Sequence, residues 1–545
     1  MATTPREVRI TVRDGVEIGA ALYLPEGNGR HPALLAPSPY RYDNNSLPAG
    51  PQFLWRETGP IDFYVAQGYA YVHMDVRGCG KSGGDFELLG PREQTDLYDV
   101  IQWIAAQPWS SGKVGGMGQS YFCMSQWWMG IMAPPALACL AAYDGLNDPY
   151  RASCYTGGIP GQFFPGYWWN QNRIINRHPA NGAAPREQNV DLDALVSSHP
   201  TYDAFWRARS AAERLHEIEV PLYSIGIWGK IDLHTRGNIE GWRRAQGPKK
   251  LQMRGPPNAW AANAEFNGTE LHEKVLLPFY DRFLKGKETE WEKRPAVEYF
   301  VRGANVMKSS DTWPPAGVQY QAWHLQAGPS GSVTSLNDGA LAQGAATGAA
   351  STSYRYPNPG WVSGVVGFGP TGPAGGFDPV RRVLTFTTAP LEADLEIAGP
   401  IKLVLHASSS ARDTDFIVKL AEQFPQSPED RAKGVNPGSM LVTKGWLRAS
   451  HRALDAKRST EMEPYHTHER PEPLEPGEVT RFDISLEPNA YRFRKGNRIR
   501  LEIANGDSPV TDMLWTHYYA PNKIGEDTIY HGVGRASALF LPVTG

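Results

Sequence analysis

The residues with the clearest chemical content are Gly118-Gln119-Ser120-Tyr121, which follow a short apolar run. A serine becomes an effective nucleophile when it stands at a sharp turn between a strand and a helix, where the backbone is strained and a small residue must precede it. At such a turn the hydroxyl of Ser120 and the backbone N–H of Tyr121 face the same point. The pattern favours transfer of an acyl group to Ser120, although short Gly-x-Ser strings also occur by chance in loops.

A serine hydroxyl needs a base within hydrogen-bond reach and an acid that keeps this base in the correct tautomer. Where the serine turn belongs to an α/β sheet, the chain order is serine, then Asp or Glu, then His. The acid is expected after a strand predicted at 220–226, and Asp232 follows that strand. Asp232 is therefore the candidate acid, with a helix cap or a loop ion pair as its alternative role.

The sequence around Ser120 alternates between strands and helices that would position it. A buried strand at 72–76 ends in a glycine-rich turn, and an amphipathic helix at about 93–107 is stopped by a proline. Further apolar strands are predicted at 220–226 and 250–254, and the chain begins with a β-hairpin. This succession predicts a parallel α/β sheet.

Three segments of this sheet also carry a family pattern. Residues 75–84 read D-x-R-G-x-G-x-S-x-G, residues 103–115 read W-I-A-x-Q-P-W-x-x-G-x-V-G, and residues 118–121 read G-x-S-Y. Together they resemble the serine hydrolases grouped around cocaine esterase, the α-amino acid ester hydrolases and the X-Pro dipeptidyl-peptidases. The resemblance extends from about Glu7 to the C-terminus. It implies an α/β-hydrolase domain with an inserted helical cap and a C-terminal jelly-roll β-sandwich.

The residue composition and pattern along the chain indicate the same division into domains. An α/β-hydrolase domain is expected at 1–145 and 216–290, with the helical cap at 146–215 between them. Short alternating segments separated by Gly, Pro and Asp predict the β-sandwich at 291–545. Within it, the Gly-, Ala- and Ser-rich stretch 328–353 is expected to be a long surface loop.

The histidine that this resemblance implies is missing. The family pattern Gly-Pro-Trp-x-His corresponds to residues 255–259, and its last position is Ala259. A methyl group cannot accept a proton. Three explanations remain open: Ala259 is a replacement that traps an inactive enzyme, another histidine such as His234 or His272 reaches Ser120, or the chain is a natural pseudoenzyme or uses a changed base.

The resemblance implies two donors for the oxyanion that forms during acyl transfer. One is the backbone N–H of Tyr121, and the other is the hydroxyl of Tyr40 in a Pro-Tyr turn. Fixed donors at the developing charge typically lower the barrier by ~3–4 kcal/mol each. Aromatic residues are the candidate substrate pocket, although such clusters are equally common in ordinary cores. They are Phe164, Trp168, Trp169 and Trp228.

Composition excludes several classes of function. The formal net charge is −3 over 545 residues, which gives no electrostatic case for nucleic acid or a membrane surface. The four cysteines lack metal-ligand spacing, so we expect buried thiols, no metal and no cofactor. The N-terminal residues lack the apolar core of a signal peptide, which favours a cytoplasmic location. Self-association is expected only as a family tendency.

The sequence thus predicts a serine hydrolase that cleaves a carboxylic ester or amide through an acyl-enzyme on Ser120, with Ala259 at the histidine position. The substrate is expected to be a small molecule. The alternatives are an X-Pro or amino-acid-ester peptidase or an acyltransferase of the same family, or a non-catalytic binding pseudoenzyme. We find no acidic cluster for a free α-amine, which favours neutral aromatic or acyl esters.

Overall fold

The computed structural model describes residues 4–43, 56–178, 188, 190–231, 233–357, 383–507, 517 and 519–545. The chain forms two compact units. The first comprises Met1–Ala152, Phe164–His199 and Ala204–Tyr299, and the second comprises Ser153–Phe163, Pro200–Asp203 and Phe300–Gly545. The domain boundaries expected from the sequence, including those of the cap, remain predictions.

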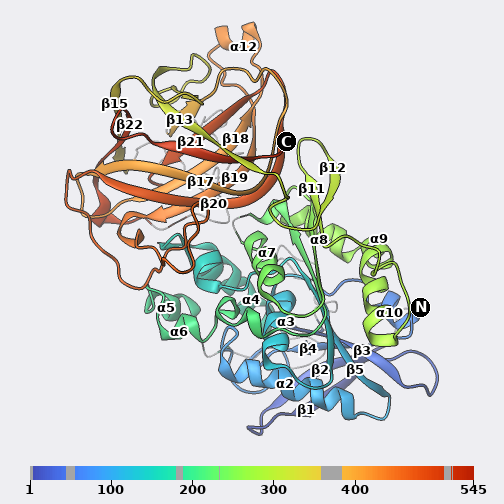
Figure 1. The fold of residues 1–545 in the computed structure, drawn as a ribbon. Helices are drawn as coiled ribbons and strands as arrows, with labels where there is room; N and C mark the ends of the chain where they lie inside the picture. The colour runs from blue at the N-terminus through green and yellow to red at the C-terminus, as the bar shows by residue number, and fades with distance from the viewer. Residues whose placement is uncertain are drawn as a thin grey trace. The chain divides into compact units, whose positions relative to one another are not determined.

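The first unit is built on a mixed sheet whose central strands are parallel (Figure 1). The first two strands form the antiparallel hairpin predicted from the sequence, and the second pairs antiparallel with β4. The other strands named below pair in parallel. Four of them, His31–Ser38, Ala70–Asp75, Leu137–Tyr143 and Leu222–Ile227, are buried along most of their length and appear in the sequence as largely apolar runs. Across the sheet the order is β1 (Arg6–Thr11), β2 (Glu17–Tyr23), β4 (Ala70–Asp75), β3 (His31–Ser38), β5 (Ser110–Gly116), β6 (Leu137–Tyr143), β9 (Leu222–Ile227), β10 (Lys249–Arg254) and β11 (Val297–Val301).

Helices connect these strands as a parallel sheet requires. Pro91 occupies the first turn of α2, where a proline costs no helical hydrogen bond, and α3 is buried along almost its whole length. A π-helical turn at His272–Leu276 separates the last two of these helices. The helices are α1 (Ile61–Ala66), α2 (Pro91–Ala106), α3 (Tyr121–Met132), α7 (Thr235–Arg244), α8 (Ala259–Asn267), α9 (Thr269–Leu271) and α10 (Leu277–Lys285).

Short helical pieces make up much of the predicted cap. In the first unit they are α4 (Trp169–Arg177), α5 (Leu192–Ser197) and α6 (Ala204–Arg207), preceded by a π-helical segment at Phe163–Trp168. Two 3-10 turns follow at Ala211–Glu213 and Leu215–Glu217. The short strands β7 (Tyr155–Thr156) and β8 (Ile159–Pro160) belong to the second unit.

The second unit is a β-sandwich in which the sheet folds back on itself. The long strand β17 pairs with β20, β22 and β23, and a bulge after Gly399 lets it change direction. The strands of the sandwich are β13 (Gln319–Pro329), β14 (Gly339–Ala342), β15 (Ala349–Tyr356), β16 (Leu384–Thr387), β17 (Leu395–Ser409), β18 (Asp415–Gln423), β19 (Ser439–Arg448), β20 (Thr480–Phe493), β21 (Arg498–Ala504), β22 (Gly525–Gly532) and β23 (Ala538–Val543). The strand β12 (Val306–Ser310) instead pairs with β11 in the mixed sheet. A short helix, α12 (Pro428–Ala432), lies between β18 and β19.

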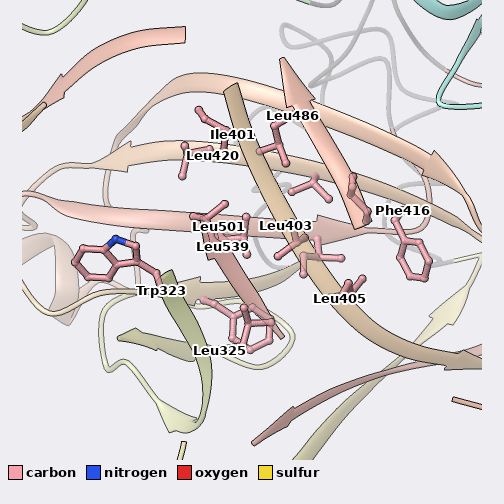
Figure 2. Close-up of a cluster of buried hydrophobic side chains, with 14 of the residues drawn as sticks. Trp323, Leu325, Ile401, Leu403, Leu405, Phe416, Leu420, Leu486, Leu501 and Leu539 are labelled. Atoms are coloured by element: carbon pink, nitrogen blue, oxygen red, sulfur yellow. The ribbon is translucent and has the colours of Figure 1, made fainter. Parts of the chain in front are cut away.

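Leucine, isoleucine and aromatic side chains fill the space between the layers of this sandwich, as Figure 2 shows for Leu403, Leu501 and Leu539. The prediction of a long loop at 328–353 is wrong, because β14 lies within this stretch and β15 begins within it. Their Gly, Ala and Ser side chains carry little strand signal, and the strands form because β13, β16 and β22 pair with them.

Candidate active site

Ser120 lies between β5 and α3 in a strained backbone conformation, with φ 61° and ψ −117°. Its backbone N–H donates to the carbonyl oxygen of Asp144 at 2.9 Å, and its own carbonyl accepts from Met124 at 2.9 Å. A positive φ is costly for a residue with a side chain and persists only when the surroundings enforce it. Ser120 is also partly exposed while its neighbours are buried. This is the geometry of a nucleophile elbow.

Two glycines make the tight turn at Ser120 sterically feasible. Gly118 has φ 116°, and a Cβ at this position would collide with the side chain of Phe122. A Cβ on Gly145 would lie 2.5 Å from the Cβ of Cys123 and 3.0 Å from the carbonyl oxygen of Ser120. The close approach of the loop after β6 to the serine turn therefore depends on Gly145, which the sequence alone did not single out.

The side chain of Tyr40, after β3, bonds to the hydroxyl of Ser120. The Tyr40 oxygen also accepts a hydrogen bond from the indole N–H of Trp168 at 3.2 Å. Burial raises the pKa of Tyr40 well above its usual range, so the hydroxyl keeps its proton. With Trp168 donating to the oxygen, the phenol hydrogen is available to a group at Ser120.

Tyr121 supplies the first backbone N–H of α3, and such groups have no acceptor within their own helix. Its side-chain hydroxyl donates to Glu93 Oε1 at 2.8 Å. The rings of Tyr40 and Tyr121 contact each other edge to face, with centroids 6.3 Å apart. The structure thus brings Ser120, Tyr40 and Tyr121 together at one point.

The four aromatic residues of the predicted pocket occupy different surroundings. Trp168 stacks on Tyr121 and on Phe164, with centroid distances of 6.0 Å and 4.2 Å. Trp169 instead stacks on Phe86 at 4.9 Å. Trp228 is fully buried in a 3-10 turn directly after β9. Phe164 and Trp168 therefore form one stack with Tyr121 beside Tyr40.

Asp232, the candidate acid, lies outside the described residues. A different carboxylate, Asp144, lies directly beneath the serine turn after β6 and is fully buried. Its Oδ2 accepts from Lys230 Nζ and from the Gln119 amide, both at 2.7 Å, and its Oδ1 lies 3.2 Å from His234 Nδ1. Burial alone would raise the pKa of Asp144, but Lys230 and His234 outweigh it and hold the pKa below its ordinary value.

Ala259 is the first residue of α8 and is half-buried, and the side chain of Asn258 caps the helix by accepting from the Ala261 N–H. The preceding loop packs closely on the turn after β9, because a side chain at Gly229 would collide with the backbone of residues 256–258. The loops after β9 and β10 thus meet.

The histidines considered as alternative bases are held by other groups. His272 is buried, with Nδ1 2.8 Å from the Tyr64 hydroxyl and Nε2 2.5 Å from the Phe266 carbonyl oxygen. Burial lowers its pKa to about 4. Both ring nitrogens of His272 are therefore engaged. His234 approaches the serine turn through Nδ1, which bonds to Asp144.

Glu57 is a buried carboxyl that sequence reasoning missed, and it bonds to the Ser120 side chain. Its carbonyl oxygen accepts from the Gln119 N–H at 2.9 Å, which ties it to the serine turn. Burial raises the pKa of Glu57 to about 8, although the charge of Lys230 lowers it. No motif surrounds Glu57, whereas Asp144 could have been found as a carboxylate at the end of an apolar strand.

In the described part of the chain, no three or more His, Cys, Asp and Glu residues cluster so as to hold a metal ion. Within the same residues, no helix is both long and apolar enough to cross a bilayer. The cysteines Cys79, Cys123, Cys139 and Cys154 are buried thiols rather than disulfides.

The fold and the serine turn define an α/β-hydrolase joined to a C-terminal β-sandwich, and known proteins share this architecture. Residues 14–256 match the X-Pro dipeptidyl-peptidase (S15 family), and residues 289–539 match the X-Pro dipeptidyl-peptidase C-terminal non-catalytic domain. The chain therefore belongs to this family of serine hydrolases. The fold class and the resemblance predicted from the sequence are confirmed.

Individual relatives cover nearly the whole chain. Cocaine esterase from Rhodococcus sp. is 26% identical over 93% of this chain and 91% of its own length. A Mycobacterium bovis protein named as a provisional serine esterase is 28% identical over 98% of this chain and 94% of its own length. A solved CocE/NonD family hydrolase from Staphylococcus aureus superposes with a TM-score of 0.81 at 24% identity, covering 99% of this chain and 93% of that structure.

Proposed function

We propose that this protein hydrolyses a carboxylic ester or amide through an acyl-enzyme on Ser120. The main support is the positive φ of Ser120 together with the hydrogen bond between its hydroxyl and Tyr40. The family of the chain is consistent with this reaction. Ala259 at the histidine position means that the proton of Ser120 must go to another group.

In the proposed reaction, the Ser120 oxygen attacks the acyl carbon and a tetrahedral oxyanion forms. The hydroxyl of Tyr40 and the backbone N–H of Tyr121 donate to this oxyanion, and donors in fixed positions stabilise charge that develops only in the transition state. Collapse of the oxyanion expels the alcohol or amine and leaves an ester on Ser120. Water then attacks that ester and releases the acid.

The stacked rings of Phe164, Trp168 and Tyr121 favour a neutral substrate with a bulky acyl or aryl group, because aromatic faces bind apolar groups. The related proteins are named as esterases and as peptidases. We favour an ester, since ester cleavage needs no strong acid to protonate the leaving group.

The experiment measures hydrolysis of p-nitrophenyl butyrate and labelling by a fluorophosphonate probe for the wild type and Ser120→Ala. We expect turnover and labelling in the wild type and loss of both in the variant. Circular dichroism checks that the variant is folded. Equal activity of the two proteins would refute Ser120 as the nucleophile.

A binding protein without catalysis is the second candidate, and the methyl group of Ala259 is the observation that favours it. A protein of this kind would neither turn over the ester nor react with the fluorophosphonate, yet would bind a non-hydrolysable ester analogue in calorimetry. Residual catalysis by an oxyanion hole alone would give rates several powers of ten lower than those of a complete triad.

A further inference from the structure

The carboxyl group of Glu57 is placed against the nucleophile and is only 1% exposed. The Ser120 side chain bonds to this carboxyl, while Oε2 has no hydrogen-bond partner among the described residues. A buried carboxyl oxygen without a donor is costly and calls for an explanation, of which a catalytic role is one. Glu57 is fixed by its backbone bond to Gln119, so its position follows the serine turn.

Among the described residues, three charged or titratable groups face Glu57, each from a different element. They are Tyr40 after β3, Asp144 after β6 and Lys230 after β9. Lys230 makes its ion pair with Asp144 at 2.7 Å. Lys230 therefore compensates Asp144 first, and its charge acts on Glu57 without a direct ion pair between them.

Two of the other candidate positions are less suited to this role. Ala259 carries no proton acceptor, and both ring nitrogens of His272 are bonded to Tyr64 and Phe266. His234 bonds to Asp144 through Nδ1, which by itself does not exclude it, because a triad histidine is held by its acid in the same way. Among the described residues, Glu57 is a carboxyl group that bonds to the Ser120 side chain itself.

We infer that Glu57 is the proton acceptor for Ser120, which makes it a catalytic residue of the proposed ester hydrolysis. This inference rests on the proposed function. As the Ser120 oxygen bonds to the acyl carbon, its O–H bond breaks and the proton moves to the Glu57 carboxylate, while the carbonyl electron pair moves to the oxyanion. Collapse of the oxyanion breaks the bond to the leaving alcohol, which takes the proton from Glu57. In deacylation Glu57 accepts a proton from water in the same way.

The environment of Glu57 suits this task. An ordinary carboxylate is too weak a base for a serine hydroxyl, and efficiency improves as the pKa of the base approaches the working pH. Burial raises the pKa of Glu57 to about 8. Because only the ionised form accepts a proton, the rate should rise with pH and level off above about 8.

The test compares kcat and KM for p-nitrophenyl butyrate from pH 6 to pH 10 in the wild type, Ser120→Ala, Glu57→Gln and Glu57→Asp. Glu93→Gln is the matched control. Glu93 is also fully buried with its pKa raised to about 8, but its two oxygens accept from Tyr121 and Leu89 rather than from the nucleophile.

We expect Glu57→Gln to lower kcat by about 10²–10⁴-fold with little change in KM, and to abolish the rise with pH. Glu57→Asp should retain part of kcat, and the midpoint of its pH–rate profile should be shifted. Glu93→Gln should keep the shape of the wild-type profile.

Two outcomes would overturn the inference while leaving the proposed function standing. One is a Glu57→Gln variant with wild-type kcat and an unchanged pH profile, while Ser120→Ala is inactive. The other is a raised KM at unchanged kcat, which would make Glu57 a substrate-binding group. If Glu57→Gln does not fold, the pH–rate profile of Glu57→Asp tests the inference: a midpoint equal to that of the wild type would overturn it. An inactive wild type equal to Ser120→Ala would refute the proposed function as well.

Discussion

Replacing Glu57 by glutamine should make the protein more stable at alkaline pH. The pKa of Glu57 rises from 4.5 to about 8 because the folded protein disfavours the charged carboxylate. The neutral carboxyl group of Glu57 contributes its full share to the stability of the folded protein below pH 4.5. This contribution is lost as the pH rises through about 8. Glutamine resembles the neutral carboxyl group and does not ionise, so the variant escapes this loss.

The size of the effect follows from the two pKa values. Linkage gives a loss of about 2 kcal/mol in the wild type by pH 6 and about 5 kcal/mol by pH 9. The difference in stability between Glu57→Gln and the wild type should therefore widen by about 3 kcal/mol between these two pH values. For a unit of this size, that corresponds to roughly 6 °C in melting temperature.

Differential scanning calorimetry at pH 6 and pH 9 measures this change, and Glu270→Gln is the control. Glu270 is exposed and pairs with Lys274, so its replacement should add no stability at alkaline pH. A difference between Glu57→Gln and the wild type that stays constant from pH 6 to pH 9 would mean that Glu57 does not change its charge in this range. The reasoning about its burial would then be refuted.

Three further variants test the surroundings of Ser120. Tyr40→Phe removes one oxyanion donor and should lower kcat for p-nitrophenyl butyrate about 10²–10³-fold at similar KM; an unchanged kcat would exclude the hydroxyl. Lys230→Met leaves the buried Asp144 carboxylate without its ammonium partner and should cost about 3–5 kcal/mol in urea unfolding at pH 7, and a loss below about 1 kcal/mol would contradict this. Ala259→His should change kcat less than about threefold if Glu57 supplies the base, whereas a gain of several powers of ten would show that only an imidazole was missing.

The part of the proposed site that could be predicted from the sequence is encoded locally. Ser120 and Tyr121 stand in one contiguous motif, and Tyr40 follows a short apolar strand, so short patterns were sufficient to propose them. The hairpin and the parallel strands were predicted for the same reason, because burial on both faces leaves continuous apolar runs.

The acidic and basic residues around Ser120 could not be predicted in this way. Glu57, Asp144 and Lys230 lie on three separate loops, and only the order of strands in the sheet brings these loops together. The strands β14 and β15 were missed for a related reason, since their small residues depend on partner strands far along the chain. Asp232 remains a prediction.

Because every cysteine is buried, reaction of its thiol with an alkylating reagent can report local unfolding of the protein. Cys123 lies one turn after Ser120 in α3, and burial raises the pKa of its thiol well above the ordinary value. A thiol can be alkylated only after the backbone around it separates. The rate of alkylation at Cys123 would therefore report how often the helix that follows Ser120 opens, without any substrate. Cys154 belongs to the second unit. Comparing the labelling rates of the peptides that contain Cys123 and Cys154 would therefore show which unit unfolds first.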